Sequence, residues 1–343
     1  CAWQLGRSSS EVIPHHLRAE SVLAAAAEDA RTGRMRAKNL IWLAFHAWNQ
    51  EGAERPAMST LKKAASLAES LGDDEVLADV DSIRARVVQG TNAEAARRYY
   101  DKALTRLESA KAVRSSASVL RDRGRLLLDL GEYDESRRDF MRSLELYNRL
   151  EEPEQEAWVA VDLIELELAG GDVEAAARWR GHAQELRPRD AFLRNGVGLA
   201  YDRRSNLNGD TSLLETAADC FAEAVAIGEE AVFYANRGNS RAVLARRIGV
   251  ADAERSRNLR AAGLADLEEA RKRAPRDVRI ATELAAVQRE SGDAAAAAAT
   301  AAQAGEQLLA AIRDYTRGHG SARRVIPMEL RNLFYSVLEL PLE

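Results

Sequence analysis

The fold of this chain is decided by residues 120–150, which read LRDRGRLLLDLGEYDESRRDFMRSLELYNRL. Gly131 and Glu132 form a turn signal near the middle, because glycine ends one helix in a left-handed conformation and a carboxylate favours the start of the next. Ser136 and Ser143 follow, seven residues apart. Seven residues make about two helical turns, so both small side chains share a face that a neighbouring helix can approach closely. The stretch therefore predicts two helices joined by a tight turn.

The same cassette recurs along the chain: a small residue, a residue of variable size four places later, and a second small residue seven places after the first. The seven copies are Ala57/Leu61/Ala64, Ala96/Tyr100/Ala103, Ser136/Phe140/Ser143, Ala176/Arg180/Ala183, Ala217/Phe221/Ala224, Gly263/Leu267/Ala270 and Ala297/Ala301/Ala304. Their starts are separated by 39, 40, 40, 41, 46 and 34 residues. This spacing is typical of one repeated helical hairpin.

Turn signals support the repeat independently, which matters because an alanine-rich chain produces paired alanines by chance. Glycine followed by an acid also precedes two other cassettes, as Gly171-Asp172 and Gly292-Asp293. Pro188 and Pro275 each stand five residues beyond the second small residue of a cassette. Since proline cannot continue a helix, it marks the gap between hairpins.

Together these positions resemble the tetratricopeptide repeat. In that family the first helix carries a tryptophan followed by a glycine, and the second helix carries a small residue, then an aromatic residue, and is followed by a proline. Leu120 and Gly124 occupy the first-helix positions before Ser136, as Tyr234 and Gly238 do before Gly263. The resemblance covers roughly residues 38–310, although most periods are near 40 residues and not the 34 of the family. In two cassettes Arg180 and Ala301 replace the aromatic.

This resemblance implies an all-α, right-handed superhelical solenoid of about seven hairpins. We expect an N-terminal tether over residues 1–16, the solenoid over 17–316, and a break followed by a capping helix over 317–343. The break is predicted at Gly318-His319-Gly320-Ser321, and the last helix is predicted to begin at Pro327. That helix either covers the apolar end of the solenoid or docks into another protein.

Composition argues against several classes of function. The net charge is -5 with 30% charged residues of both signs, whereas a nucleic-acid-binding protein needs a concentrated basic face. The arginine-rich stretch 241–260 is interrupted by Asp252 and Glu254 and is interpreted as a solvated helix face. The five histidines lack metal-binding spacing, no glycine loop is suited to phosphate, and Cys220 lies in a predicted helix as a packed, inert thiol. We therefore expect no catalytic residue, metal, cofactor, small-molecule substrate or nucleic acid.

The first residues, Cys1-Ala2-Trp3-Gln4, resemble the start of a mature bacterial lipoprotein. The resemblance implies lipid attachment at Cys1, a polar tether after it, and an outer-membrane location facing the periplasm. A fragment boundary that happens to fall at Cys1 is the alternative, and a cytoplasmic protein would then be expected.

Two surfaces are candidates for binding a partner. By resemblance, the first helix of each hairpin lines a concave groove, which here would present Arg121, Arg125, Glu165, Asn195, Leu199, Arg203, Asn236 and Asn239. Amides at Asn236 and Asn239 suit an extended peptide because each both donates and accepts hydrogen bonds. Ordinary polar surface is the alternative.

The second candidate follows from the long intervals of 41 and 46 residues. They indicate insertions at Asp202–Ser212 and roughly Arg246–Asn258, on one edge of the solenoid, unless the helices simply run longer there. The predicted binding residues of these insertions are Arg204, Asn206, Asn208, Arg246 and Arg247.

From the sequence we thus expect a non-catalytic scaffold or adaptor, an envelope lipoprotein that holds partner proteins in an assembly. A soluble regulatory or co-chaperone module that binds peptide tails in its groove is the alternative. A third alternative is the sensory half of an enzyme whose catalytic domain has been cut away.

Overall fold

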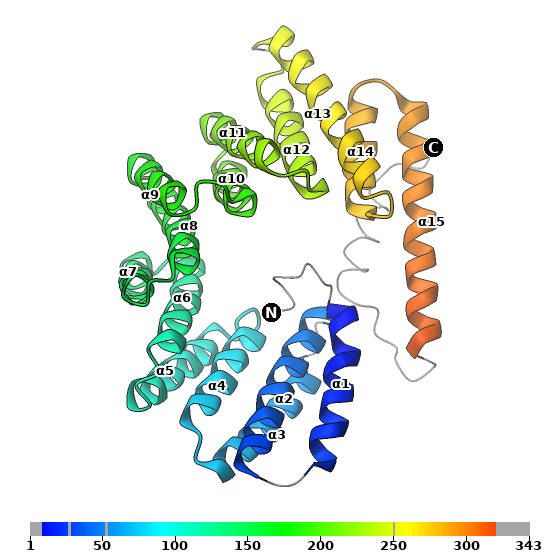
Figure 1. The fold of residues 1–343 in the computed structure, drawn as a ribbon. Coiled ribbons are helices and arrows are strands. Elements are labelled where there is room, and N and C mark those ends of the chain that lie inside the picture. Colours follow the sequence, from blue (N-terminus) through cyan, green and yellow to red (C-terminus); the bar gives the residue numbers. More distant parts are fainter. Residues whose placement is uncertain (1–8, 27–28, 52–53, 250, 320–343) are drawn as a thin grey trace. The chain divides into compact units, whose positions relative to one another are not determined.

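The computed structural model describes residues 9–26, 29–51, 54–249 and 251–319, and every regular element within these ranges is an α-helix. The helices are α1 (Ser9–Ala25), α2 (Ala30–Glu51), α3 (Glu54–Leu71), α4 (Asp74–Val88), α5 (Ala93–Ser109), α6 (Val113–Asp129), α7 (Tyr133–Arg149), α8 (Pro153–Gly170), α9 (Val173–Leu186), α10 (Ala191–Asn208), α11 (Thr211–Ile227), α12 (Ala231–Ile248), α13 (Ala253–Arg273), α14 (Val278–Glu290) and α15 (Ala294–His319). Figure 1 shows their order along the chain. The predicted all-α class is confirmed for the described part of the chain.

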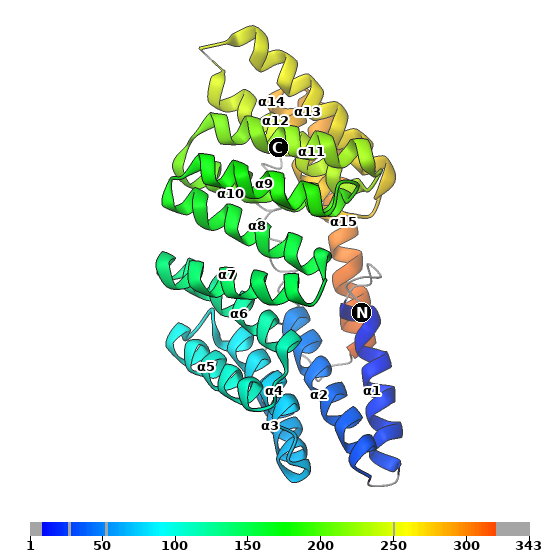
Figure 2. The ribbon, with the colours of Figure 1, turned by 60° about the vertical axis from the view of Figure 1, so that its left-hand side comes forward.

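Consecutive helices pack in pairs, as Figure 2 shows from a second direction. The pairs among the described helices are α2/α3, α4/α5, α6/α7, α8/α9, α10/α11, α12/α13 and α14/α15, and α1 packs on α2. Every one of the seven cassettes lies in the second helix of its pair. The repeated hairpin predicted from the spacing is therefore confirmed, and the fold is a solenoid of the tetratricopeptide type.

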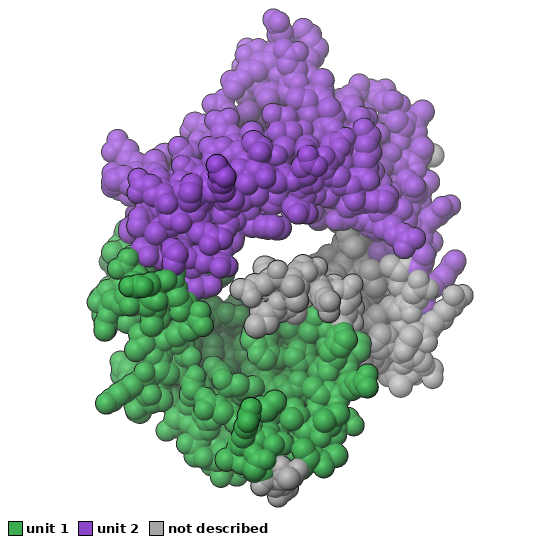
Figure 3. All heavy atoms as spheres, viewed as in Figure 1, with its two compact units in different colours: residues 1–152 green, residues 153–343 purple. Residues whose placement is uncertain are grey.

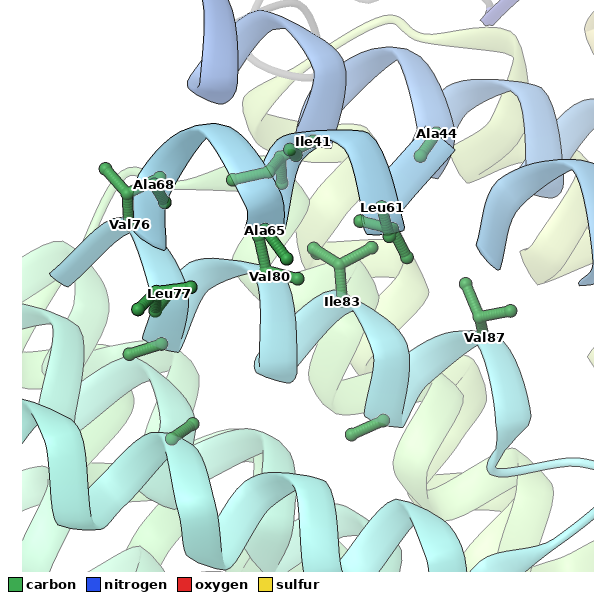
Figure 4. Close-up of a cluster of buried hydrophobic side chains, with 14 of the residues drawn as sticks. Ile41, Ala44, Leu61, Ala65, Ala68, Val76, Leu77, Val80, Ile83 and Val87 are labelled. Atoms are coloured by element: carbon green, nitrogen blue, oxygen red, sulfur yellow. The ribbon is translucent and has the colours of Figure 1, made fainter. Parts of the chain in front are cut away.

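The chain divides into two compact units, residues 1–152 and 153–343, which Figure 3 distinguishes by colour. The first unit holds α1 to α7 and the second α8 to α15, so no hairpin is split between them. Each unit has its own core. In the first, Ile41, Leu61, Val80 and Ile83 from three successive helices are buried together (Figure 4).

The turn signals work largely as predicted. Gly131, Gly171 and Gly292 all adopt left-handed conformations, with φ of 78°, 85° and 88°. Asp172 and Asp293 cap the next helix, since their Oδ1 atoms accept hydrogen bonds from the backbone N–H groups of Ala175 (2.8 Å) and Ala296 (2.9 Å). Glu132 does not cap α7. Its carboxylate instead accepts a hydrogen bond from Arg97 of α5 at 2.7 Å, so this acid joins two hairpins.

Small residues let the helices of a hairpin approach closely. A Cβ atom added at Gly124 would lie 2.6 Å from the ring of Phe140, and one added at Gly198 would lie 2.6 Å from the ring of Phe221. Both rings are buried. The glycine of the first helix and the aromatic residue of the second thus interlock, which is the packing that the repeat pattern predicts.

The structure confirms the prediction that Cys220 is a packed thiol. It is buried in the core of the second unit, next to Phe221 and near Ala217 and Tyr201. Burial raises the pKa of the Cys220 thiol to about 11, so the reactive thiolate form is scarce at neutral pH.

Several boundaries differ from the sequence expectations because helices run longer than predicted. α1 already begins at Ser9, inside the expected tether 1–16, and α15 passes through Gly318 to His319, where a break is expected. Cys1 and the predicted capping helix after Pro327 lie outside the described residues.

The two expected insertions are also mostly helical. α10 continues to Asn208, and only the turn at Gly209, with φ of 79°, separates it from α11. α13 begins at Ala253, so most of the stretch 246–258 belongs to helices as well. The alternative reading, in which the helices simply run longer, is the correct one. No described helix is both long enough and apolar enough to span a bilayer.

Candidate functional site

A stripe of three exposed residues and one buried asparagine runs along α10, the first helix of its hairpin. Phe192, Asn195, Leu199 and Arg203 are spaced by three or four residues, which places them on one side of the helix. Phe192 is 57% exposed and Leu199 is 38% exposed, although large apolar side chains are normally buried. The Phe192 ring packs edge-on against the buried Phe233 ring of α12, with 5.0 Å between their centroids, and this contact holds it in place.

Two asparagines from successive hairpins meet beside this stripe. The Nδ2 atom of Asn236 on α12 donates a hydrogen bond to the Oδ1 atom of Asn195 on α10 at 2.8 Å. Asn195 is only 7% exposed. Among the described residues, the Nδ2 atom of Asn195 and the Oδ1 atom of Asn236 have no further hydrogen-bond partner. The pair therefore leaves one donor on the buried Asn195 and one acceptor on the half-buried Asn236, the two kinds of group that an extended peptide backbone pairs with.

Charged groups at the far end of the stripe are already paired. Arg203 forms an ion pair with Glu165 of α8 at 3.1 Å, which joins two hairpins on the same side. Arg203 remains exposed, so this pair adds little stability and leaves N–H groups for a ligand. Burial raises the pKa of Asp202, while Arg247 and a hydrogen bond from Asn206 partly oppose this effect.

The groove residues predicted from sequence are divided between the two compact units. Asn195, Asn236 and Arg203 lie on the α10/α12 side of the second unit, and Asn239 lies one turn beyond Asn236, half-buried and without a described hydrogen-bond partner. Arg121 and Arg125 lie on α6 of the first unit. Arg121 is half-buried near Tyr147; burial raises the pKa of the Tyr147 phenol, and the charge of Arg121 partly opposes this rise.

Four of the five residues predicted to bind through insertions form contacts between hairpins. Arg204 donates to the carbonyl oxygen of Ala169 on α8 at 3.2 Å, and Arg246 pairs with Glu290 of α14 at 2.7 Å. Arg247 donates to Ser205 at 2.5 Å and to Asn206 at 2.9 Å. The Oδ1 atom of Asn208 accepts from the N–H of Asp210 in the turn. These contacts tie together the ends of four first helices, and a role in binding stays a prediction.

Two features were missed by the sequence analysis. Phe192 extends the predicted stripe by one turn, and its spacing from Asn195 and Leu199 was the available signal. A pocket of about 640 Å³ between α5, α6 and α7 of the first unit was also missed, since it depends on how second helices pack. Within the described ranges, no group of three or more His, Cys, Asp or Glu side chains is arranged to hold a metal ion.

Comparison with known proteins identifies relatives in structure and not in sequence. No protein-family profile and no curated protein matches this chain. The structure of yeast Tom70 superimposes with a TM-score of 0.66 at 16% identity, covering 97% of this chain and 59% of that one. BtubC (BKLC) from P. vanneervenii gives a TM-score of 0.53 at 19% identity, covering 64% of this chain and 91% of that one. This chain thus spans less than two thirds of the Tom70 structure, and at these identities the likeness is one of fold.

Proposed function

We propose that this chain is a non-catalytic interaction module that binds an extended segment of a partner protein along α10 and α12. The observation that supports the proposal is the Asn195–Asn236 pair, whose second donor and acceptor have no described partner, together with the exposed side chains of Phe192 and Leu199 on either side of Asn195 along α10. Amide groups of this kind satisfy the backbone of a bound peptide, while the apolar side chains receive its side chains. Rigid helices hold all four residues, so little ordering is needed on binding.

Selection of a ligand from random peptides displayed on phage provides the first test. The best peptide is synthesised with a fluorophore, and its affinity for the whole chain is measured by fluorescence anisotropy. We expect Asn195→Ala to weaken binding about tenfold. The backbone group of the peptide that is hydrogen-bonded to Asn195 then has no partner, which costs about 1.4 kcal/mol. Leu199→Glu should weaken binding at least as much, since it places a carboxylate in the apolar contact.

Val173→Glu on α9 is the matched control, because Val173 is also an exposed apolar residue (46%) but lies on a second helix. It should bind the selected peptide like the wild type. Equal affinity of the Leu199→Glu and Val173→Glu variants would show that the stripe on α10 is not the binding surface.

The cellular role remains a further part of the proposal. A lipid anchor at Cys1 would make the chain an envelope scaffold, and its absence would favour the soluble regulatory or co-chaperone module. Intact mass spectrometry of the protein from its native host separates these roles. A lipoprotein should exceed the polypeptide mass by a diacylglyceryl group, and by an acyl group where the amine is also modified. An unmodified Cys1 would refute the anchor.

A further inference from the structure

The pocket in the first unit is built from two second helices over a first helix. α5 and α7 form its walls, α6 forms its floor, and its volume is about 640 Å³. Its lining includes the leucines Leu104, Leu107, Leu120 and Leu146, of which Leu107 and Leu146 are buried. The volume lies within the range of known ligand sites, and the leucines supply an apolar part of the lining.

One end of the pocket is positively charged. Lys111 follows the end of α5 and Arg149 ends α7; both line the pocket, both are exposed, and neither forms an ion pair with a described residue. Other basic residues of the lining are neutralised: Arg123 pairs with Asp101 (2.6 Å) and Asp139 (2.7 Å). The available positive charge is therefore concentrated where α5 and α7 end.

Two backbone features add to this end of the pocket. α6 begins there, at Val113, and no side chain caps its N-terminus, so its partial positive charge is not offset locally. Lys111 has a φ of 53°, a left-handed conformation that Gly131 adopts in the next turn of the chain. Glu151, just after α7, has a similar φ of 54°, so both turns at this end of the pocket are closed by a non-glycine residue in the left-handed region.

We propose that this pocket is a second binding site, which takes a partner segment carrying leucine-like side chains next to carboxylates. The apolar side chains enter between α5 and α7, and the carboxylates pair with Lys111 and Arg149. Two acidic residues also line the pocket. Asp101 is already bound to Arg123, whereas Glu108 is exposed and forms no ion pair with a described residue, so Lys111, Arg149 and Glu108 together leave a net charge of one positive unit at this end. The site is separate from the α10/α12 stripe of the second unit and does not depend on the function proposed for that stripe.

Fluorescence anisotropy with three labelled peptides tests the chemistry of the site. The first, SGDLLEDLEG, carries both leucines and acids. The second, SGKLLKKLKG, replaces each acid with lysine, and the third, SGDSSEDSEG, replaces each leucine with serine. Saturable binding to the whole chain is expected for the first peptide alone. Failure of the first peptide to bind overturns the proposal, and so does equal binding of the third, which would indicate a site for charge only.

Variants then locate the site. An exposed ion pair changes affinity up to about fivefold, so the double variant Lys111→Glu/Arg149→Glu should weaken binding of the first peptide at least about tenfold. Arg98→Glu/Arg138→Glu makes the same change of charge on α5 and α7, at exposed residues outside the pocket lining, and should weaken it much less. Equal weakening by both double variants would overturn the proposal.

Ser116→Trp is a third variant that alters no charge. Ser116 lines the pocket from α6, and an indole at this position fills the space between the walls. Binding should be lost while circular dichroism shows an unchanged helix content, and binding retained by this variant would place the peptide elsewhere. Leu199→Glu should bind the first peptide like the wild type, which distinguishes this site from the stripe on α10.

Discussion

Gly263→Ala should lower the free energy of unfolding by about 2 kcal/mol, although alanine is normally the better helix residue. A Cβ atom at position 263 would lie 2.8 Å from the backbone oxygen of Gly238, and one at position 238 would lie 2.9 Å from the backbone oxygen of Gly263. Backbone atoms cannot rotate away as side chains do, so α12 and α13 have to separate. Overpacking costs about 1–3 kcal/mol, and a clash with backbone belongs at the upper end of this range, so subtracting the gain of about 1 kcal/mol from replacing a helical glycine leaves a net loss of about 2 kcal/mol.

The same substitution at Gly181 is the control, and it should have the opposite sign. Gly181 lies within α9, and a Cβ atom there would meet no atom within 4 Å. Gly181→Ala should therefore stabilise the chain by about 0.5–1 kcal/mol through helix propensity alone. Urea unfolding of the whole chain, followed by circular dichroism, measures both variants. Stabilisation by both would show that α12 and α13 do not depend on a glycine contact.

Local signals explain why so much of the fold could be predicted from the sequence. A left-handed glycine and a capping aspartate act within a few residues, so the turns at Gly171-Asp172 and Gly292-Asp293 could be recognised without knowing what packs nearby. The small residues of the cassettes similarly reflect contact with the partner helix of the same hairpin. Turn residues and small residues recur along the chain at similar intervals, and this recurrence distinguishes the pattern from a chance match.

Longer spacing between cassettes was ambiguous because extra residues can extend a loop or a helix. Residues 202–208 contain no helix breaker, and Gly209 is the first residue that ends α10. Asp252 gives the corresponding signal for α13, since its Oδ1 atom caps the helix through the N–H of Arg255. These two residues were sufficient to place the helix ends, whereas the interval lengths were not.

Of the two candidate sites, one could be predicted in part from the sequence and the other could not. Asn195 and Asn236 occupy comparable places on first helices of successive hairpins, and the structure joins them by a hydrogen bond. The pocket beside Lys111 and Arg149 lies between second helices, whose outer sides carry no repeat signal. Sequence analysis that considers only first helices therefore cannot find it.

The arginine-rich stretch was interpreted as a solvated face, and Arg246, Arg255 and Arg257 are indeed exposed, but several of its arginines also pair with other helices. Arg241 pairs with Asp266, Arg246 with Glu290 and Arg255 with Glu215, each from a different helix. Partners in these pairs are separated by 25 to 44 residues in sequence. An arginine that joins two helices has the same local pattern as an arginine in solvent, so only the packed structure distinguishes them.

Asp266→Ala should be the most destabilising charge substitution in this group, by about 3 kcal/mol. Asp266 lies on α13, is 6% exposed and accepts hydrogen bonds from two arginines of α12: Arg237 at 2.6 and 3.0 Å, and Arg241 at 2.7 Å. Removing the carboxylate leaves two guanidinium groups without their counter-ion between packed helices. Breaking a buried pair costs about 3–5 kcal/mol, and the lower value applies because both arginines keep some contact with water.

Glu215→Ala is the matched control for this loss. It breaks the pair between Glu215 and Arg255, whose side chains are both largely exposed, so the expected cost is below about 0.5 kcal/mol. Both variants are unfolded with urea as whole chains, at low salt and at high salt. Salt should reduce the small effect of Glu215→Ala and leave most of the effect of Asp266→Ala, because screening acts mainly on exposed charges. Equal costs for the two variants would mean that Asp266 is solvated like any surface acid and that α12 and α13 are held by apolar and glycine contacts alone.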